Sequence, residues 1–544
     1  MDYRHNGRKA RARTSRHASL VAFAIVAFAS GIATVANAGT WQPLNNHFPT
    51  TTIHDTNGTV LGPGGASSPL LMTDGTVFVE NSGWGGADGR VFKLTPDING
   101  SYVNGTWSEI ARMPYDPIGD SQAVLADGRV LIEGGEYTGP SFNFLLTNQG
   151  AIYDPVKNKW TNVPPPLFFE DLYPPRHKFA PHPIGDSVNV VLPDGTFMLG
   201  DKMSRQGALL DPKSLTWKET GGETKSDLND EEGWTLLPNG EVLTVDCYTD
   251  YNFGLISNYP ANPTNSEIYN PTTHQWSSAG STINTLTDPV LYEMGPAILR
   301  PDGTVFATGS EGYTAIYHAK AGVWSAGPRL PISPQGNQYS LQDAPGALLP
   351  NGDVLIAATG GANDPGNGNY ADPPVAFFLF DGTNLIADAT IPNANEDVSG
   401  SLNLLVLPSG QILEVDETGD VEIYTPSNNF YDKSWAPQIS DAPKTISPGA
   451  SYTISGYRFN GMSQASSFGD EEQSAENYPI VRITNAATGH VFYSRTHDHS
   501  SMAVASPNKV STTFDVPTGQ ELGPSKLEVV ANGIPSKPFI VNVK

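Results

Sequence analysis

Residues 123–135 read AVLADGRVLIEGG, which is two apolar runs joined by an Asp-Gly pair. An Asp-Gly or Asn-Gly pair at this place predicts a type I′ β-hairpin, because both central residues of that turn need positive φ. The unit occurs seven times, and its other copies cover residues 70–78, 190–200, 235–246, 297–309, 347–361 and 404–416. Repetition at this spacing indicates an architecture built from one repeated sheet.

Most hairpins are followed by a second feature, a strand ending in Tyr-Asp-Pro or a variant, then a tight loop and a Trp. Tyr153 with Trp160 is one such pair, and Tyr269 with Trp276 is another. We expect these rings to pack between neighbouring sheets. Two hairpins per unit give a four-stranded antiparallel sheet, and seven such sheets around an axis form a β-propeller. Segment 39–43 carries a Trp outside any unit, so it is predicted to add the outer strand that closes the ring.

A leader precedes the repeats. Six Lys and Arg residues lie between Arg4 and Arg16, an apolar run covers residues 20–29, and Ala36-Asn37-Ala38 has the small-residue spacing of a cleavage site. This pattern predicts a signal peptide over residues 1–38 and a mature protein that is secreted or periplasmic. Removing the leader shifts the formal net charge from −25 to −30. This acidity argues against nucleic acid as a partner. No later segment is apolar enough for a membrane span, and we expect a monomer.

The pattern changes at about residue 436. Short alternating runs, such as 452–456 and 527–530, are separated by polar turns and predict an immunoglobulin-like β-sandwich over residues 436–544. An acidic, Ser-rich loop between these runs, residues 461–478, is typical of a solvated face. The predicted fold class is therefore all-β, with a seven-bladed propeller over residues 39–435 followed by the sandwich.

The repeats resemble kelch repeats in the apolar run before Gly134-Gly135 and in the pair Tyr153 and Trp160. A kelch propeller followed by a sandwich is similar to the galactose oxidase and glyoxal oxidase family, and the resemblance covers nearly the whole chain after the leader. It implies that a loop of the C-terminal domain enters the central channel of the propeller and brings a histidine to copper. Thr496-His497 lies where that loop is expected.

The resemblance also implies copper bound by two tyrosines and two histidines, with one tyrosine crosslinked to a cysteine. Most of these residues are missing at the matching positions. Residues 64–69 contain no cysteine, Asp120 stands where the crosslinked tyrosine is expected, and only Tyr137 matches the stacking tryptophan. Residues 398–401 contain neither the Tyr nor the His of the last blade. The standard copper-radical site is therefore predicted to be mostly absent, with His497 the remaining ligand.

Cys247 is the single cysteine, so the chain forms no disulfide within itself. One interpretation is a buried structural thiol. The alternative is a crosslink to Tyr248 or Tyr137, which would rebuild a site of a different kind.

Acidic residues recur seven to nine residues ahead of the turns in successive units, where each innermost strand begins. Innermost strands start near the central channel, so these carboxylates are expected to converge there. With His497 and His499 they would form an oxygen-rich metal site, or they would act as a general acid/base pair. The alternative is a water-filled rim. In the fourth unit the recurring acids are Glu231 and Glu232. The catalytic candidates are Asp120, Asp186, Glu232, Glu293, Asp343 and His497, and the metal candidates are His497 and His499.

Substrate-binding candidates lie in loops near the same face. Arg176 and His177 belong to the densest positive cluster there, which would hold a substrate carboxylate or act as a base. The alternative is an exposed loop with no role. Trp84, Tyr137 and Tyr248 would stack on sugar rings, or they would only pack loops against one another.

Three functions stay open. The leading one is an exported protein that binds or processes carbohydrate at the channel face without the standard copper-radical site. The second is a copper-radical alcohol or aldehyde oxidase with a rearranged site, and the third is a non-catalytic binding or adhesion module. A metal ion is one option for the cofactor, with calcium compatible and copper disfavoured. The expected partner is a carbohydrate or another small-molecule or polymer substrate.

Overall fold

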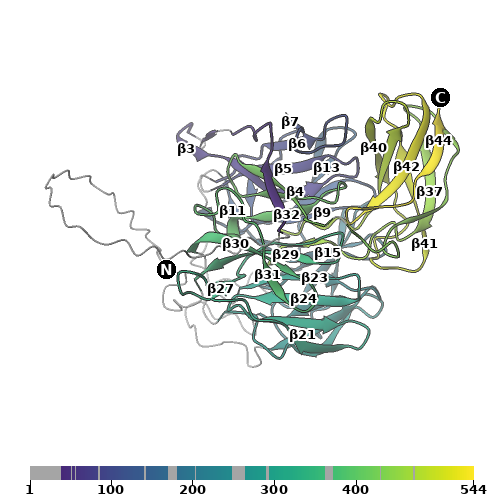
Figure 1. The fold of residues 1–544 in the computed structure, drawn as a ribbon. Helices are drawn as coiled ribbons and strands as arrows, with labels where there is room; N and C mark the ends of the chain where they lie inside the picture. The colour runs from purple at the N-terminus through teal and green to yellow at the C-terminus, as the bar shows by residue number, and fades with distance from the viewer. Residues whose placement is uncertain are drawn as a thin grey trace, which may run out of the picture. The chain divides into compact units, whose positions relative to one another are not determined.

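The computed structural model describes residues 38–50, 52–54, 57–83, 86–139, 143–169, 180–202, 204–247, 264–288, 293–361, 372–428, 430–469 and 472–544. The regular structure in these residues is almost entirely β, with one short 3₁₀ helix, η1 (Ser399–Ser401), beside 44 strands (Figure 1). The predicted leader, apart from Ala38, lies outside the described residues. In the described parts of the chain, no helix is long and apolar enough to cross a membrane.

Seven antiparallel blades form a β-propeller, which confirms the predicted propeller: six are four-stranded sheets, and the seventh is the four-stranded part β28–β31 of a six-stranded sheet that also includes β27 and β38. The innermost strands are recognised by their mutual contacts: β32 lies beside β4, β4 beside β9, β9 beside β15, β19 beside β23, β23 beside β28, and β28 beside β32. In blades 1 to 6 the chain runs from the innermost strand outward.

The first three blades are β4 (Gly65–Leu71), β5 (Val77–Ser82), β6 (Val91–Thr95) and β7 (Thr106–Glu109); β9 (Ser121–Val124), β10 (Val130–Glu133), β13 (Gly150–Asp154) and β14 (Lys159–Val163); and β15 (Asn189–Val191), β16 (Phe197–Gly200), β17 (Gly207–Asp211) and β18 (Thr216–Thr220). The next three are β19 (Thr235–Leu236), β20 (Val242–Val245), β21 (Asn265–Asn270) and β22 (Gln275–Ser281); β23 (Met294–Leu299), β24 (Thr304–Gly309), β25 (Thr314–His318) and β26 (Val323–Ala326); and β28 (Gly346–Leu348), β29 (Val354–Gly360), β30 (Asp372–Phe380) and β31 (Leu385–Ala387). Blade 7 is β32 (Asn403–Val406), β33 (Ile412–Val415), β34 (Val421–Thr425) and β1 (Thr40–Pro43). Shorter strands in the connections are β2 (Thr52–His54), β3 (Val60–Pro63), β8 (Pro117–Ile118), β11 (Tyr137–Thr138), β12 (Asn143–Phe144) and β27 (Tyr339–Ser340).

The N-terminal strand β1 closes the ring, as the Trp in segment 39–43 predicted. It pairs with β34 so that Trp41 lies opposite Tyr424. The Trp41 ring also lies 4.8 Å, centroid to centroid, from Phe377 in blade 6, and its Nε1–H donates to the Ala389 carbonyl at 2.9 Å. Trp41 therefore holds the closing strand against the neighbouring blade.

The hairpin turns differ from the predicted type I′. Only the Gly of each Asp-Gly type pair has positive φ, such as 74° at Gly75, and Asp74 does not. The Gly75 amide donates to the Met72 carbonyl at 2.9 Å, and the Asp74 carboxylate accepts from the Thr76 amide at 3.0 Å. This is a type I turn followed by a left-handed glycine, and the Asp stabilises it through its side chain instead of its own φ.

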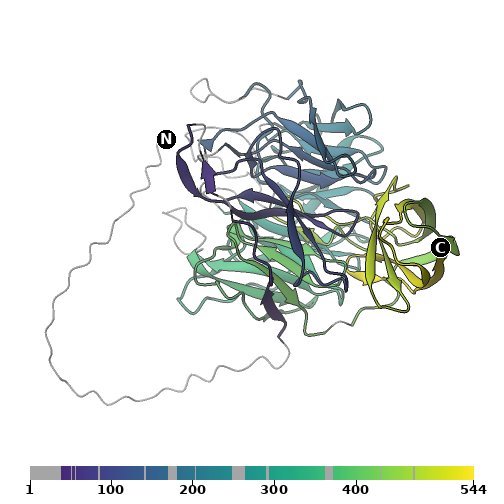
Figure 2. The same cartoon turned by 90° about the horizontal axis from the view of Figure 1, so that it is seen from above.

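Residues after the propeller form one nine-stranded sheet, coloured green to yellow in Figure 2. Its strands are β35 (Gln438–Asp441), β36 (Thr445–Ile446), β37 (Ser451–Tyr457), β39 (Ile480–Asn485), β40 (Val491–His497), β41 (Lys509–Asp515), β42 (Gly523–Ala531), β43 (Ile534–Pro535) and β44 (Phe539–Val543). Their apolar side chains, including Ile454, Phe514 and Val529, form a core of their own. The immunoglobulin-like form of this region stays a prediction.

We predict that Trp41→Ala lowers the free energy of unfolding by about 2–3 kcal/mol, below the usual cost for a fully buried Trp because Trp41 is half-buried. The loss should also release the closing strand, so amide hydrogen exchange should accelerate in β1 and β34. Trp107→Ala is the matched control, because Trp107 is also half-buried in an outermost strand but does not join the chain's two ends. Equal exchange in β1 for both variants would contradict the closing role.

Candidate functional site

The loop 461–478 of the C-terminal region, called the inserted loop below, runs along the propeller axis. It contains strand β38 (Ser466–Ser467), which pairs with the innermost strand β28, opposite Ala347 and Gly346. The Ala465 carbonyl accepts from the Leu348 amide at 2.7 Å. Further along the loop, a Cβ on Gly469 would lie 3.2 Å from the Cα of Asp343. Residues 465–469 therefore run along the free edge of β28 towards the first residue of that strand. Because β28 is an innermost strand, its free edge faces the propeller axis.

The same loop touches other blades from inside. The Gln464 Oε1 atom accepts from the Leu236 amide in blade 4 at 2.7 Å, and Glu472 Oε2 accepts from the Asn403 side chain in blade 7 at 2.9 Å. The backbone of Gly119 and the side chain of Ser68 also hydrogen-bond to Glu472. The interpretation of loop 461–478 as a solvated face is therefore wrong for its described residues, because innermost strands surround them.

His497 and His499 do not enter the channel with this loop. His497 is the last residue of β40, where the register places it opposite Thr513 of β41. Its Nε2 lies 3.2 Å from Asp515 Oδ1 and its Nδ1 lies 2.8 Å from Asp498 Oδ2. Pairing with β41 fixes this position, so the expectation that His497 would reach the channel is corrected.

His499 lies against the turn end of the innermost strands. Its amide donates to the Ala126 carbonyl at 2.9 Å, in the turn that follows β9, and its Nδ1 lies 2.9 Å from Thr512 Oγ1. Burial lowers its pKa to about 3, so the ring is neutral. The acidic candidates lie at the opposite, starting end of these strands. Among the described residues, neither histidine joins a group of carboxylates that could share a metal ion, and the shared metal site expected from the sequence is not assembled.

All the predicted acids lie shortly before the innermost strand of their blades. Asp120 precedes β9, Asp186 precedes β15, and Glu293 precedes β23. Glu231 and Glu232 precede β19, and Asp343 precedes β28. These side chains therefore lie at the starting ends of the innermost strands, where the structure divides them into three groups.

The first group surrounds Lys202, which the sequence analysis did not single out. The Lys202 Nζ lies 2.5 Å from Asp186 Oδ2 and 2.8 Å from Glu231 Oε1, and it also contacts Asp230. Burial alone would lower the pKa of Lys202, but the surrounding carboxylates raise it well above its usual value. Burial raises the pKa of Asp186 to about 6, against the opposing effect of Lys202. A permanent ammonium therefore sits among these acids.

Asp343 lies next to this group, where Gly469 of the inserted loop packs against its backbone. Its carboxyl hydrogen-bonds with that of Glu293, and its Oδ1 has no hydrogen-bond partner among the described residues. Burial raises the pKa of Asp343 to about 7, and the charges of Glu231 and Asp288 add to this shift. Asp343 and Glu231 both have left-handed backbones, with φ of 41° and 57°. Such conformations are costly for residues other than glycine and often mark functional sites.

A second group joins Asp120 to Glu80 and Glu472. Asp120 is fully buried, and neither of its carboxyl oxygens has a partner among the described residues. Burial raises the pKa of Asp120 and of Glu80 well above the usual range, and the charge of Glu472 adds to both shifts. Burial and the charge of Glu472 therefore favour the protonated forms of Asp120 and Glu80. Glu472 could not have been assigned to this group without the path of its loop.

Glu232 belongs to a third group, away from Asp343. Its Oε1 lies 2.6 Å from the buried Lys225 Nζ, and its Oε2 accepts from the Trp234 indole at 3.2 Å. Glu231 therefore replaces Glu232 as the blade 4 acid of the Lys202 group. Cys247 is buried close by, and its thiol donates to the Glu231 carbonyl at 3.0 Å. Burial raises the pKa of this thiol well above its usual value.

Tyr137 is the one predicted substrate-binding residue that the structure describes. It is half-buried in β11, and burial, with the nearby charges of Glu136 and Asp186, raises its pKa. Arg176, His177, Trp84 and Tyr248 lie outside the described residues. Their roles, and a crosslink of Cys247 to Tyr248, stay predictions.

The described donors around Tyr137 do not fit a copper site of the expected kind. The groups that act on its phenol are carboxylates, whereas the set implied by the resemblance pairs phenolates with imidazoles. A rearranged site built on Tyr137 and His497 would also need these two side chains together, and the contacts of His497 lie with Asp498 and Asp515.

The fold and site define an all-β propeller protein with an acidic group at one end of its channel. No family model and no curated protein sequence matches the chain. Among solved structures the chain is similar to a fungal alcohol oxidase of the AA5 family in complex with copper, with a TM-score of 0.45 and 15% identity over 93% of this chain and 100% of that one. It is also similar to a streptogramin B lyase (TM-score 0.44, 11% identity, 72% and 98% covered) and to YCF48 from Cyanidioschyzon merolae (0.39, 11%, 71% and 99%). Scores at this level assign neither a family nor a function.

The buried acids predict that the protein is more stable at pH 5 than at pH 8. Burial raises the pKa to about 6 for Asp186, about 7 for Glu232, Asp343 and Glu422, and about 8 for Glu417 and Glu476. Between the usual value near 4 and these values, the folded state holds protons that the unfolded chain has lost. Stability therefore falls as pH rises through this window, by up to about 1.4 kcal/mol per pH unit for each group.

Urea denaturation at pH 5, 6.5 and 8, at constant ionic strength and with EDTA, would measure this slope. His499 works in the opposite direction, because its pKa is lowered, but only below its usual value near 6.5. Glu476→Gln removes one titrating group and should flatten the slope. Stability that rises from pH 6.5 to pH 8 would contradict the prediction.

Proposed function

We propose that the protein is an exported carbohydrate-processing enzyme that works by acid/base catalysis at the channel face of its propeller. Asp343 serves as the general acid, and Glu231 serves as the carboxylate base or nucleophile. The observation that supports this most directly is that Asp343 and Glu231 lie in environments that favour opposite protonation states. Burial raises the pKa of Asp343 to about 7, whereas the neighbouring Glu231 carboxylate lies 2.8 Å from the Lys202 ammonium.

Two carboxyl groups with opposite protonation states are the equipment for cleaving a glycosidic bond. A carboxylic acid that is still protonated near pH 7 can deliver a proton to the leaving oxygen. Lys202 favours the ionised form of Glu231, which can then activate water or attack the sugar carbon. Glu293 and Lys202 are positioning residues in this proposal, since each acts through a carboxyl group that would touch the substrate.

Two sequence features support the carbohydrate class: the resemblance to sugar-oxidising propellers and the aromatic residues expected near the channel. Tyr137, together with Trp84 and Tyr248, would provide stacking surfaces, and Arg176 with His177 would bind a carboxylate of an acidic sugar. The predicted leader supports export. His497 and His499 are left out, because His497 contacts Asp498 and Asp515 and His499 lies at the turn end of the innermost strands.

Incubating the mature chain with a panel of neutral and acidic polysaccharides tests the proposal. We expect new reducing ends from at least one polymer, with the activity lost in Asp343→Asn. Binding without product, unchanged in that variant, would favour a non-catalytic binding module. Peroxide release only after copper loading would favour a rearranged oxidase, and either result would overturn the proposal.

A further inference from the structure

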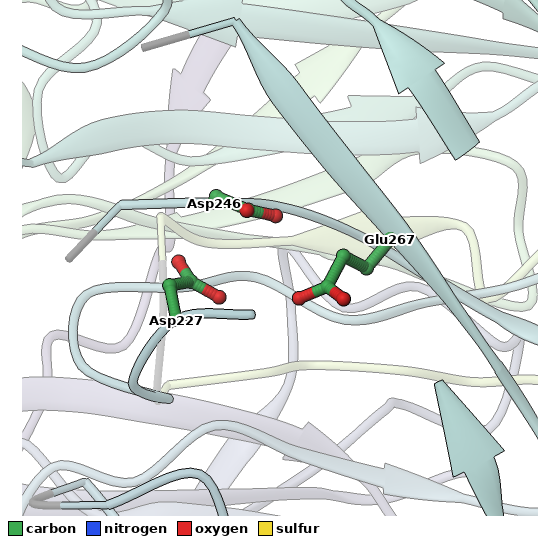
Figure 3. A group of neighbouring side chains, drawn as sticks. All are labelled: Asp227, Asp246 and Glu267. Carbon is green, nitrogen blue, oxygen red and sulfur yellow. The ribbon is translucent and has the colours of Figure 1, made fainter. Parts of the chain in front are cut away.

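A group of carboxylates in blade 4 lies apart from the proposed catalytic pair. Asp227 comes from the connection between β18 and β19, Asp246 follows β20, and Glu267 lies in β21. One carboxylate oxygen from each lies within 4.8 Å of the other two, and Figure 3 shows the three groups turned toward one another. All three residues are buried, with at most 3% of their surface exposed.

The charge of this group is not balanced by the described side chains around it. Lys225 is the ammonium among these acids: it contacts Asp227, lies 2.6 Å from Glu232 Oε1, and lies 3.7 Å from Glu267 Oε2. One ammonium therefore faces four carboxylates, including Asp246. Burying unpaired charge is strongly unfavourable, so the group needs either protons or a further cation.

Two buried oxygen atoms on the same face of the β20–β21 pair have no hydrogen-bond partner among the described residues. Asp246 Oδ2 accepts from Ser226 Oγ at 2.8 Å and from the Asn265 side chain, whereas Asp246 Oδ1 has no hydrogen-bond partner among the described residues. The Thr244 hydroxyl, 1% exposed, also has none. Thr244 lies directly opposite Glu267 in the β20–β21 register, so its side chain shares the face of Glu267 and Asp246.

We propose that Asp227, Asp246 and Glu267 bind a divalent cation, with calcium as the preferred ion and Thr244 as a further oxygen ligand. The donors are all oxygen atoms, which hard cations select, and calcium tolerates an irregular set of six to eight ligands better than magnesium does. Lys225 keeps its contact with Glu232 when the ion is bound. The proposal does not depend on the proposed catalytic function.

The site joins three parts of blade 4 that hydrogen bonds and the ion pairs of Lys225 already connect. It links the ends of β20 and β21 to the connection that carries Asp227, and four residues later this connection carries Glu231. A bound cation would therefore stabilise the segment that presents Glu231 to Lys202.

Terbium luminescence provides a direct test, because Tb³⁺ occupies calcium sites and is excited by nearby tryptophan. Trp234 donates to Glu232, and the Trp276 ring lies 5.3 Å from Lys225 Nζ. After EDTA treatment, the mature protein should show tryptophan-sensitised emission that saturates at one Tb³⁺ per chain and is displaced by Ca²⁺. Asp246→Asn should weaken Tb³⁺ binding by about 10- to 100-fold. Asp397→Asn, which changes a similarly buried acid in another blade, should leave binding unchanged.

Two further measurements test the site even if Asp246→Asn does not fold. Ca²⁺ should raise the Tm of the EDTA-treated wild-type protein, and Thr244→Val should weaken Tb³⁺ binding while keeping the shape of the side chain. No sensitised emission and no change of Tm in millimolar Ca²⁺ would overturn the proposal. Equal affinity in wild type, Asp246→Asn and Thr244→Val would also overturn it, since the ion would then bind elsewhere.

Discussion

Asp343→Asn should lower the turnover of the carbohydrate reaction by about 10²- to 10⁴-fold, the usual contribution of a general acid. The amide keeps the shape of the side chain and the oxygen that faces Glu293, but it has no proton to donate to a leaving group. The wild-type rate should fall as pH rises above about 7, because Asp343, whose pKa is about 7, then loses its proton. The residual activity of the variant should lose this alkaline limb.

Asp397→Asn is the matched control for this loss. Burial also raises the pKa of Asp397 to about 7, with the charges of Asp416 and Glu422 adding to the shift. Asp397 is nevertheless grouped with blade 7 acids and not with Lys202, so its replacement should leave both turnover and the pH profile intact. Initial rates from pH 5 to pH 9 compare the two variants. If Asp343→Asn kept more than half of the wild-type turnover, Asp343 would not be the acid.

The repeated hairpins were enough to predict the propeller, because seven copies of one pattern leave few other architectures. Trp41 was also interpretable, since a Trp outside any unit needs a blade to complete. The type of the hairpin turns could not be predicted in this way. An Asp-Gly pair suits a type I′ turn and equally a type I turn with a left-handed glycine, and only the φ of Asp74 separates the two.

The placement of the candidate site followed from strand position, but its contacts did not. The rule that acids precede innermost strands located Asp186 and Asp343 correctly. Lys202 follows a second strand, where no rule of that kind directed attention, although a lysine beside a strand rich in apolar residues is a signal for a buried ion pair. The sequence could not decide whether Glu231 or Glu232 contacts Lys202, because the side chains of neighbouring residues point in different directions.

The inserted loop was missed because its composition suggests solvent. Ser and Glu residues dominate 461–478, yet Glu472 finds its partners about seventy residues away in the sequence, at Asn403, and further still at Ser68. A single sequence contains no information about such distant pairs. The position of His497 could not be predicted either, because residues 494–497 are all polar and the sequence gives no sign that the strand that begins at Val491 extends to the histidine.

The second large effect concerns stability. Lys202→Met should lower the free energy of unfolding by about 3–5 kcal/mol at pH 8, because it leaves the carboxylates of Asp186, Asp230 and Glu231 without their cation. The Lys202 side chain is only 3% exposed, so water cannot replace the ammonium. Methionine keeps most of the side-chain volume, and the loss therefore reports charge more than packing.

The pH dependence of that loss separates charge from packing. Without Lys202 the three acids should take up protons more readily, so the deficit should shrink at pH 5, where a packing defect would persist unchanged. Lys157→Met is the control, because Lys157 makes a 2.6 Å ion pair with Asp154 but its side chain is 73% exposed, and such pairs contribute less than about 1 kcal/mol. Urea denaturation of both variants at pH 5 and pH 8 gives the comparison. Equal deficits for Lys202→Met at both pH values would show that its ammonium does not hold the acidic group together, and the ionised state assigned to Glu231 would lose its support.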